Sequence, residues 1–245
     1  EDVDFKIVPP ATPLSRNGLR QQLGTLRDRV TTALHAAGFA FDPADKTALN
    51  SQNESRYTVY QLPYPESGAG EGLRPTIQIE LTYARLRLPH VVLPIASFVS
   101  EAFRRPPEVP AMPCVSITET AAEKLVSLTR RTAMDLAGLS RDADPALVRH
   151  IYDLHLMRDL VDHDAATGMV RDIAAADAAE FRNQYPAYHA DPAGETRKAL
   201  ATLQTNPVYG ARYTDFVAAM VYGEQAGFDE AMATVTAAAR RWINT

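Results

Sequence analysis

Between residues 16 and 37, apolar residues recur every three or four positions, which is the period of an amphipathic helix. The apolar stripe consists of Leu19, Leu23, Leu26, Val30 and Leu34. Ser15 precedes the stripe and predicts an N-cap, while Gly38 follows it and predicts the helix end. The stretch from 42 to 54 is polar without a period, so we expect a loop there.

Alternation of apolar and polar residues predicts strands at 1–8, 56–64 and 75–83. In the last of these, Ile77 and Ile79 share one face with Leu81, and polar residues share the other face. A glycine-rich loop before it suits a hairpin or a wider antiparallel connection. The apolar stretch 91–103 is compatible with a strand or a short helix, and the proline-containing segment from Pro106 to Pro113 ends it.

The second half of the chain has almost exclusively helical periodicity. Proline and glycine residues separate the expected helices, which cover 118–139, 145–160, 167–183, 195–205, 211–222 and 228–244. A possible cap at Thr118 opens the first of them. The pattern therefore predicts an α+β fold. A small mixed or antiparallel sheet with helices occupies 1–115, and an all-helical domain occupies 116–245.

Composition narrows the class of protein. The chain has 245 residues, of which 46% are hydrophobic and 22% charged, as in an ordinary soluble protein. No apolar run approaches the length of a membrane span, so we expect a cytoplasmic protein without a membrane partner. The single cysteine, Cys114, excludes an internal disulfide framework and any multi-cysteine metal site. The formal net charge of −5 gives no general attraction for nucleic acid.

Acidic residues on the predicted strands are candidates for a metal site. Asp2 and Asp4 lie on one face of the first strand, with Cα atoms about 7 Å apart. Carboxylate pairs of this kind can hold Mg²⁺ for phosphoryl or nucleotidyl transfer, although most Asp-x-Asp sequences are solvated strand edges. Glu80 lies mid-strand on the polar face of the third strand, and it can supply a third carboxylate if the two strands are neighbours.

A second candidate lies on the first helix of the C-terminal half. Lys124 and Arg131 are seven residues apart and share a face of that helix. Together they could bind a triphosphate, the lysine as a point charge and the arginine as a planar fork. Without further observations, a solvated basic face is the more common explanation of such spacing.

In their order and spacing, these stretches resemble the AbiEii family. The matching residues are Glu1-Asp2-Val3-Asp4-Phe5, Ile77-Gln78-Ile79-Glu80-Leu81, Thr120-Ala121-Ala122-Glu123-Lys124-Leu125 and Arg149-His150-Ile151-Tyr152-Asp153-Leu154. The C-terminal stretch from Phe216 to Tyr222, followed by Phe228-Asp229-Glu230-Ala231, is also similar. AbiEii proteins are nucleotidyltransferase-like toxins of bacterial type IV toxin–antitoxin and abortive-infection systems, with a fold similar to that of the DNA polymerase β superfamily.

The resemblance implies a role for each matching residue. Asp2 and Asp4 would be catalytic metal ligands for Mg²⁺, with Glu80 as a third, more variable acid. Lys124 would contact the phosphates of an NTP substrate, and the catalytic acid Asp153 would orient Lys124 or activate the acceptor hydroxyl. Arg131 is added to the nucleotide site from its spacing alone. The implied acceptor is a tRNA, a protein or another nucleotide, and the implied partner is a cognate antitoxin.

The sequence departs from the family pattern at two places. The Gly-Gly or Gly-Ser turn and helix that precede the family's acidic strand are absent, so we expect residues upstream of Glu1 in the whole protein. His150 stands where the family often has aspartate. Two alternatives therefore remain open: a kinase-like phosphotransferase that uses the same site, and a catalytically degraded domain that binds a partner.

Overall fold

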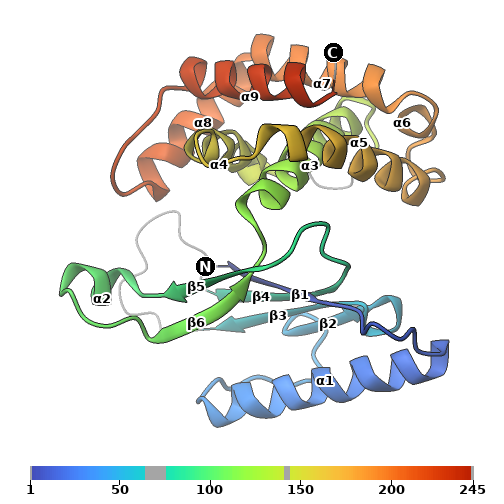
Figure 1. Cartoon of the computed structure of the whole chain (residues 1–245), viewed down its shortest axis with the longest axis vertical. Helices are drawn as coiled ribbons and strands as arrows, with labels where there is room; N and C mark the ends of the chain where they lie inside the picture. The colour runs from blue at the N-terminus through green and yellow to red at the C-terminus, as the bar shows by residue number, and fades with distance from the viewer. Residues whose placement is uncertain (1, 64–75, 141–143, 244–245) are drawn as a thin grey trace. The chain divides into compact units, whose positions relative to one another are not determined.

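The computed structural model describes residues 2–63, 76–140 and 144–243, and of Asp2 it describes the backbone alone. The chain, drawn in Figure 1, divides into two compact units, Glu1–Leu86 and Arg87–Thr245. Each unit contains a hydrophobic core of its own. The boundary predicted near residue 115 coincides with the start of the helical part of the second unit.

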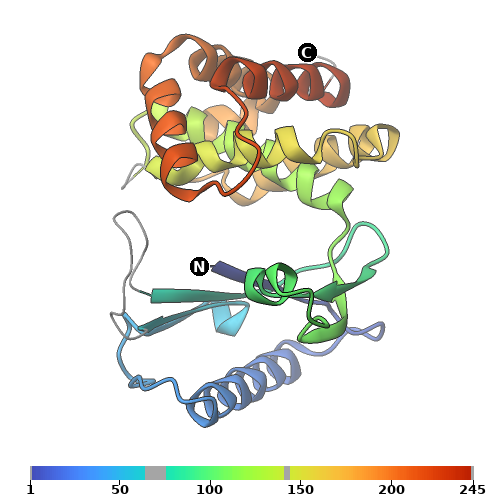
Figure 2. The same ribbon diagram turned by 90° about the vertical axis from the view of Figure 1, so that its left-hand side faces the viewer.

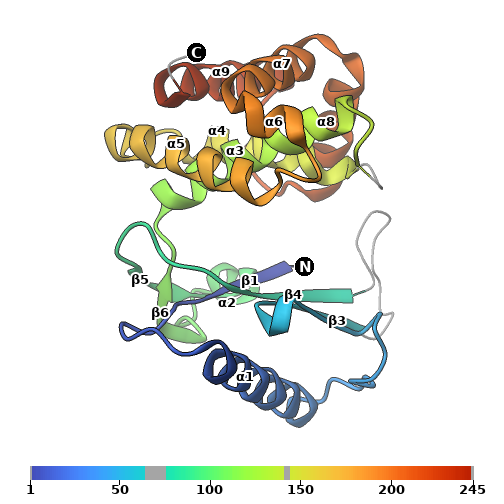
Figure 3. The same ribbon diagram turned by 90° about the vertical axis from the view of Figure 1, so that its right-hand side faces the viewer.

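A four-stranded sheet forms the centre of the first unit (Figure 3). Its strands, in spatial order, are β1 (Asp2–Ile7), β4 (Thr76–Tyr83), β3 (Tyr57–Pro63) and β2 (Leu49–Gln52). β1 runs parallel to β4, whereas the other two neighbouring pairs are antiparallel. The sheet is therefore mixed, and the two acidic strands are direct neighbours.

One face of this sheet is apolar and is covered by helix α1 (Arg16–Ala36), as Figure 2 shows. Leu49, Tyr60, Leu62 and Leu81 form the buried cluster, against which Val30 and Leu34 of α1 pack. Ser15 caps α1 by accepting a hydrogen bond from the backbone N–H of Gly18 at 3.1 Å, and Gly38 follows the helix with a φ of 95°. Both helix-end predictions are confirmed.

The second unit begins with a two-stranded antiparallel hairpin and continues as helices. The hairpin consists of β5 (Val91–Ile95) and β6 (Val109–Cys114), with the short helix α2 (Phe98–Ala102) between them. The remaining elements are α3 (Ile117–Leu136), the 3₁₀ turn η2 (Pro145–Val148), α4 (Arg149–Met157), α5 (His163–Glu180), α6 (Pro186–Ala190), α7 (Pro192–Thr205), α8 (Pro207–Met220) and α9 (Phe228–Ile243).

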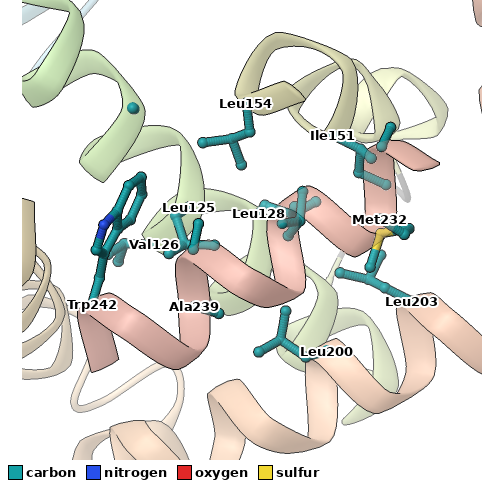
Figure 4. Packing of buried hydrophobic residues seen from close by; sticks show 14 of the residues in the cluster. Leu125, Val126, Leu128, Ile151, Leu154, Leu200, Leu203, Met232, Ala239 and Trp242 are labelled. Atoms are coloured by element: carbon teal, nitrogen blue, oxygen red, sulfur yellow. The ribbon is translucent and has the colours of Figure 1, made fainter. Parts of the chain in front are cut away.

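Helix α3 is central to this helical part because it packs against α4, α5 and α7. Leu125, Leu128 and Ile151 are fully buried there, and Trp242 of α9 is nearly so (Figure 4). The predicted α+β fold with a helical C-terminal region is confirmed. In the part of the chain that the structure describes, no helix combines the length and apolar character needed to cross a membrane.

Two local predictions are wrong, and one strand was not predicted. The expected loop 42–54 contains β2 and most of the 3₁₀ turn η1 (Asn53–Ser55). The proline-containing segment after residue 106, for which no strand was predicted, contains β6. Finally, Ser116 caps α3 in place of Thr118, by accepting a hydrogen bond from the N–H of Glu119 at 3.1 Å. The Thr118 hydroxyl instead accepts a hydrogen bond from the N–H of Asp162 at 3.0 Å.

Candidate functional site

The face of the sheet opposite α1 carries the acidic residues. Asp4 of β1 is aligned with Glu80 of β4, and residues aligned across paired strands point to the same face. Neighbouring strands are roughly 4.8 Å apart, so the two carboxylates are within reach of one cation. Asp4 is exposed and Glu80 is half-buried. The register thus brings together the two acids that sequence spacing could only suggest.

Two neutral side chains lie beside Glu80. The Gln78 side-chain amide donates a hydrogen bond to Oε1 of Glu80 at 2.6 Å, and the Tyr57 phenol lies near the same carboxylate. Burial, followed by the charges of Glu80 and Asp4, raises the pKa of Tyr57 to about 12. Tyr57 therefore stays a neutral donor beside both carboxylates. Sequence reasoning missed it, although the polar alternation of β4 identified the face.

The predicted metal set of Asp2, Asp4 and Glu80 remains a prediction. The backbone of Asp2 is aligned with Gln78, but its side chain is outside the described part of the structure. Among the described side chains, no group of three or more histidine, cysteine or acidic residues could hold a metal ion. Two carboxylates with fixed hydrogen-bond donors fit a hard cation that completes its coordination with substrate oxygens and water.

In the second unit, Lys124 and Asp153 form an ion pair between α3 and α4. The Lys124 Nζ atom donates to Asp153 Oδ2 at 2.6 Å, and 26% and 32% of the two side chains remain exposed. α3 and α4 are held together by the buried residues Leu125, Ile151 and Leu154. The structure thus brings together the lysine and the aspartate that the resemblance singled out.

Arg131 has a carboxylate partner that the sequence analysis did not identify. Its guanidinium donates to Asp144 Oδ2 at 2.7 Å, and Asp144 also caps η2 through the N–H of Ala146. Lys124 and Arg131 therefore lie along the same helix with a carboxylate holding each of them. A row of two fixed cations is suited to binding the oxygens of a polyphosphate.

The first unit also has a cleft of about 500 Å³, but it lies on the other side of the sheet. Ile7 and Tyr83 line it from the sheet, and Leu23, Leu26 and Arg29 line it from α1. These sheet residues belong to the apolar face, so the cleft is separate from Asp4 and Glu80.

A comparison with protein families identifies the family of the chain. The family model described as "Nucleotidyl transferase AbiEii toxin, Type IV TA system" matches residues 1–234. The chain belongs to the AbiEii family. No curated protein and no solved structure gave a significant match.

The range matched by the AbiEii model, residues 1–234, includes Asp4, Glu80, Lys124 and Asp153. Membership supports a nucleotidyltransferase toxin of a toxin–antitoxin system, and it implies a cognate antitoxin. The family resemblance inferred from the residues is thereby confirmed.

Proposed function

We propose that this AbiEii protein is a Mg²⁺-dependent nucleotidyltransferase that moves the NMP group of an NTP to an RNA, such as a tRNA, or to a protein in the cytoplasm. The observation that carries the proposal is the alignment of Asp4 with Glu80 on the polar face of a family-matched sheet. Oxygen ligands of this kind suit Mg²⁺. When bound, the ion neutralises charge on the triphosphate and positions the reacting oxygens.

The chain's own residues supply positioning on the polar face. Asp4 and Glu80, with Asp2 as the proposed further ligand, hold the metal. Gln78 keeps the Glu80 carboxylate in one orientation through its hydrogen bond, and the neutral Tyr57 phenol lies near it. A prearranged set of ligands favours catalysis because little reorganisation is needed as charge develops.

In the second unit, Lys124 and Arg131 bind phosphate oxygens of the nucleotide. Asp153 holds the Lys124 ammonium, which favours an orienting role for Asp153 over that of a base. In the reaction, the acceptor hydroxyl oxygen bonds to the α-phosphorus and the bond from that phosphorus to the pyrophosphate oxygen breaks. The hydroxyl proton is released as pyrophosphate leaves.

Transfer of label from NTPs tests the proposal. The purified chain is incubated with each NTP, labelled at the α- or the γ-phosphate, with Mg²⁺ or EDTA and with RNA and protein acceptors. We expect α-label to be transferred only with Mg²⁺. Asp4→Ala should abolish transfer, whereas the control Asp28→Ala, which changes a largely exposed acid on α1, should not.

The same experiment separates the alternatives. Transfer of γ-label would show a phosphotransferase. Thermal unfolding gives a second readout, because a ligand at a hundred times its Kd stabilises the fold by about 2.7 kcal/mol. If no NTP stabilises the fold in the presence of Mg²⁺ and no label is transferred, the proposed enzymatic activity is contradicted and a degraded binding domain is favoured.

A further inference from the structure

His150 lies on α4 between two ion pairs that connect α4 and its preceding turn to α3. Asp153, which pairs with Lys124, is one helical turn after it. Asp144, which pairs with Arg131, lies before it at the start of η2. The imidazole is nine-tenths buried, and its Nδ1 atom has no hydrogen-bond partner among the described residues.

A buried polar nitrogen without a partner is costly, so His150 is not explained by packing alone. The other buried histidine of the same helix shows the usual arrangement. His155 is 3% exposed, but its Nδ1 is 3.0 Å from the hydroxyl of Thr234 on α9. Glu230, an acidic residue of α9, also lies 3.9 Å from His155 Nε2. The Nδ1 atom of His155 therefore has a hydrogen-bond partner, whereas the Nδ1 atom of His150 has none among the described residues.

The surroundings of His150 keep it neutral. Burial is the largest cause that lowers its pKa, followed by the charges of Lys124, Arg149 and Arg131, while Asp144 opposes them. Together these effects give a pKa of about 3. Asp153, the partner of Lys124, is a second carboxylate of this region. The neutral imidazole thus lies among both cations and carboxylates.

We propose that His150 is the proton-linked member of the phosphate site at Lys124 and Arg131, and that a polyphosphate bound there causes the imidazole to take up a proton from solvent. The bound anion adds negative charge beside the ring, which makes the imidazolium favourable. The protonated ring then carries an N–H at both nitrogens, and the Nδ1–H gains an anionic acceptor. Phosphate binding is therefore tighter at lower pH.

This inference rests on the proposed function, because it assumes that the bound anion is the phosphate chain of a nucleotide. It adds that the affinity for this anion depends on His150. His150 need not contact the reacting atoms, so it is a positioning residue. One linked proton changes the affinity by at most about tenfold per pH unit. The contribution of His150 to the pH dependence of the affinity disappears at pH values above the pKa of His150 in the complex.

Histidine NMR on the full chain tests the proposal without relying on enzyme activity. Ring ¹⁵N shifts, which report imidazole protonation, are recorded at pH 5.5, 6.5 and 7.5 with and without inorganic triphosphate. His150→Gln assigns the signal. We expect the free protein to show neutral His150 at all three pH values, and the saturated complex to show protonated His150 at pH 5.5.

Calorimetric titration with triphosphate completes the test. Between pH 7.5 and 5.5, the wild-type affinity should increase roughly five- to tenfold more than that of His150→Gln, since the titration of triphosphate itself is common to both. His155→Gln is the matched control and should behave like wild type. Binding with His150 still neutral at pH 5.5 would overturn the proton linkage but not the phosphate site. No triphosphate binding by wild type would overturn both.

Discussion

The Lys124–Asp153 pair is partly shielded from water, so it should contribute to stability as well as to phosphate binding. We expect a double-mutant cycle with Lys124→Gln and Asp153→Asn, followed by urea unfolding, to give a coupling of about 0.5–1 kcal/mol. The Arg241–Asp164 pair is a suitable control, because 54% and 93% of its side chains are exposed and its coupling should be near zero. Equal coupling in the two pairs would contradict the shielding argument.

His150 predicts a specific dependence of stability on pH. Its pKa in the folded protein, about 3, is below the ordinary value of 6.5, so between these values the unfolded chain binds a proton that the folded chain does not. The stability contribution of neutral His150 is therefore complete above pH 6.5 and is lost as the pH falls toward 3. Relative to wild type, His150→Gln should gain up to about 1.4 kcal/mol per pH unit in this window.

Urea unfolding at pH 7.5, 6.0 and 5.0 measures this difference. Only the difference in the free energy of unfolding between wild type and variant is informative, because the carboxylates titrate in both proteins. Parallel pH profiles would show that His150 is not held neutral. His155→Gln again serves as the control for loss of a buried histidine on the same helix.

Residue types and spacing were sufficient to select Asp4, Glu80 and Lys124 as candidates, because each lies on a regular strand or helix, whereas Asp153 was selected by the family resemblance. The partners of these residues could not be predicted in the same way. Tyr57 reaches Glu80 across two strands that are joined by a long connection. Asp144 reaches Arg131 because a turn folds back onto α3. Such contacts depend on tertiary structure, which local periodicity does not encode.

At the scale of elements, prolines explain why two helices begin earlier than expected. The expected helices began at 195 and 211, after Pro192 and after the break at Asn206-Pro207. In the structure both prolines occupy the first turn of a helix, after the capping residues Asp191 and Asn206. Proline is favoured at this position because the first helical N–H groups have no partner within the helix.

Strands were missed where the sequence lacks the usual signals. β6 contains Pro110 and Pro113, and proline normally argues against a strand. In a two-stranded hairpin each strand has an unpaired edge, where a missing N–H costs no ladder hydrogen bond. β2 is only four residues long, with Leu49 as its one apolar residue, so alternation could not reveal it.

The connection between the hairpin and α3 depends on one buried carboxylate. Glu119 is fully buried, and its Oε2 accepts hydrogen bonds from the N–H groups of Arg87 and Leu88 at 2.9 and 3.0 Å. We expect Glu119→Ala to destabilise the protein by about 2–3 kcal/mol, because hydrogen bonds to a charged acceptor are lost. Hydrogen exchange at the amides of residues 87 and 88 should accelerate.

Glu180→Ala provides the control for this change, since Glu180 is an exposed acid at the end of α5. Its effect on the free energy of unfolding should stay within about 0.5 kcal/mol. If Glu119→Ala changes the free energy of unfolding equally little, the Glu119 carboxylate does not anchor the segment before β5.

For the whole molecule, net charge limits how an RNA acceptor can be recognised. The formal charge is −5, and two arginines of α1 are already paired. Arg16 is bound to Glu54 at 2.6 Å and Arg27 to Asp28 at 2.7 Å. A protein of this kind lacks the broad positive field that draws nucleic acids to a surface irrespective of their sequence. Any RNA acceptor must therefore be selected by particular contacts.

Because a broad positive field is lacking, we expect the transferase to label its acceptors selectively. With α-labelled NTP and total cellular RNA and protein, we expect the label in one or a few species. Random single- or double-stranded RNA should show no binding in fluorescence anisotropy at micromolar protein and 150 mM salt. Binding to random RNA that weakens steeply between 50 and 200 mM salt would instead reveal several phosphate contacts, since each contributes to the salt dependence. That result would contradict selective recognition, and it would direct the search for the acceptor site to the basic residues of α1.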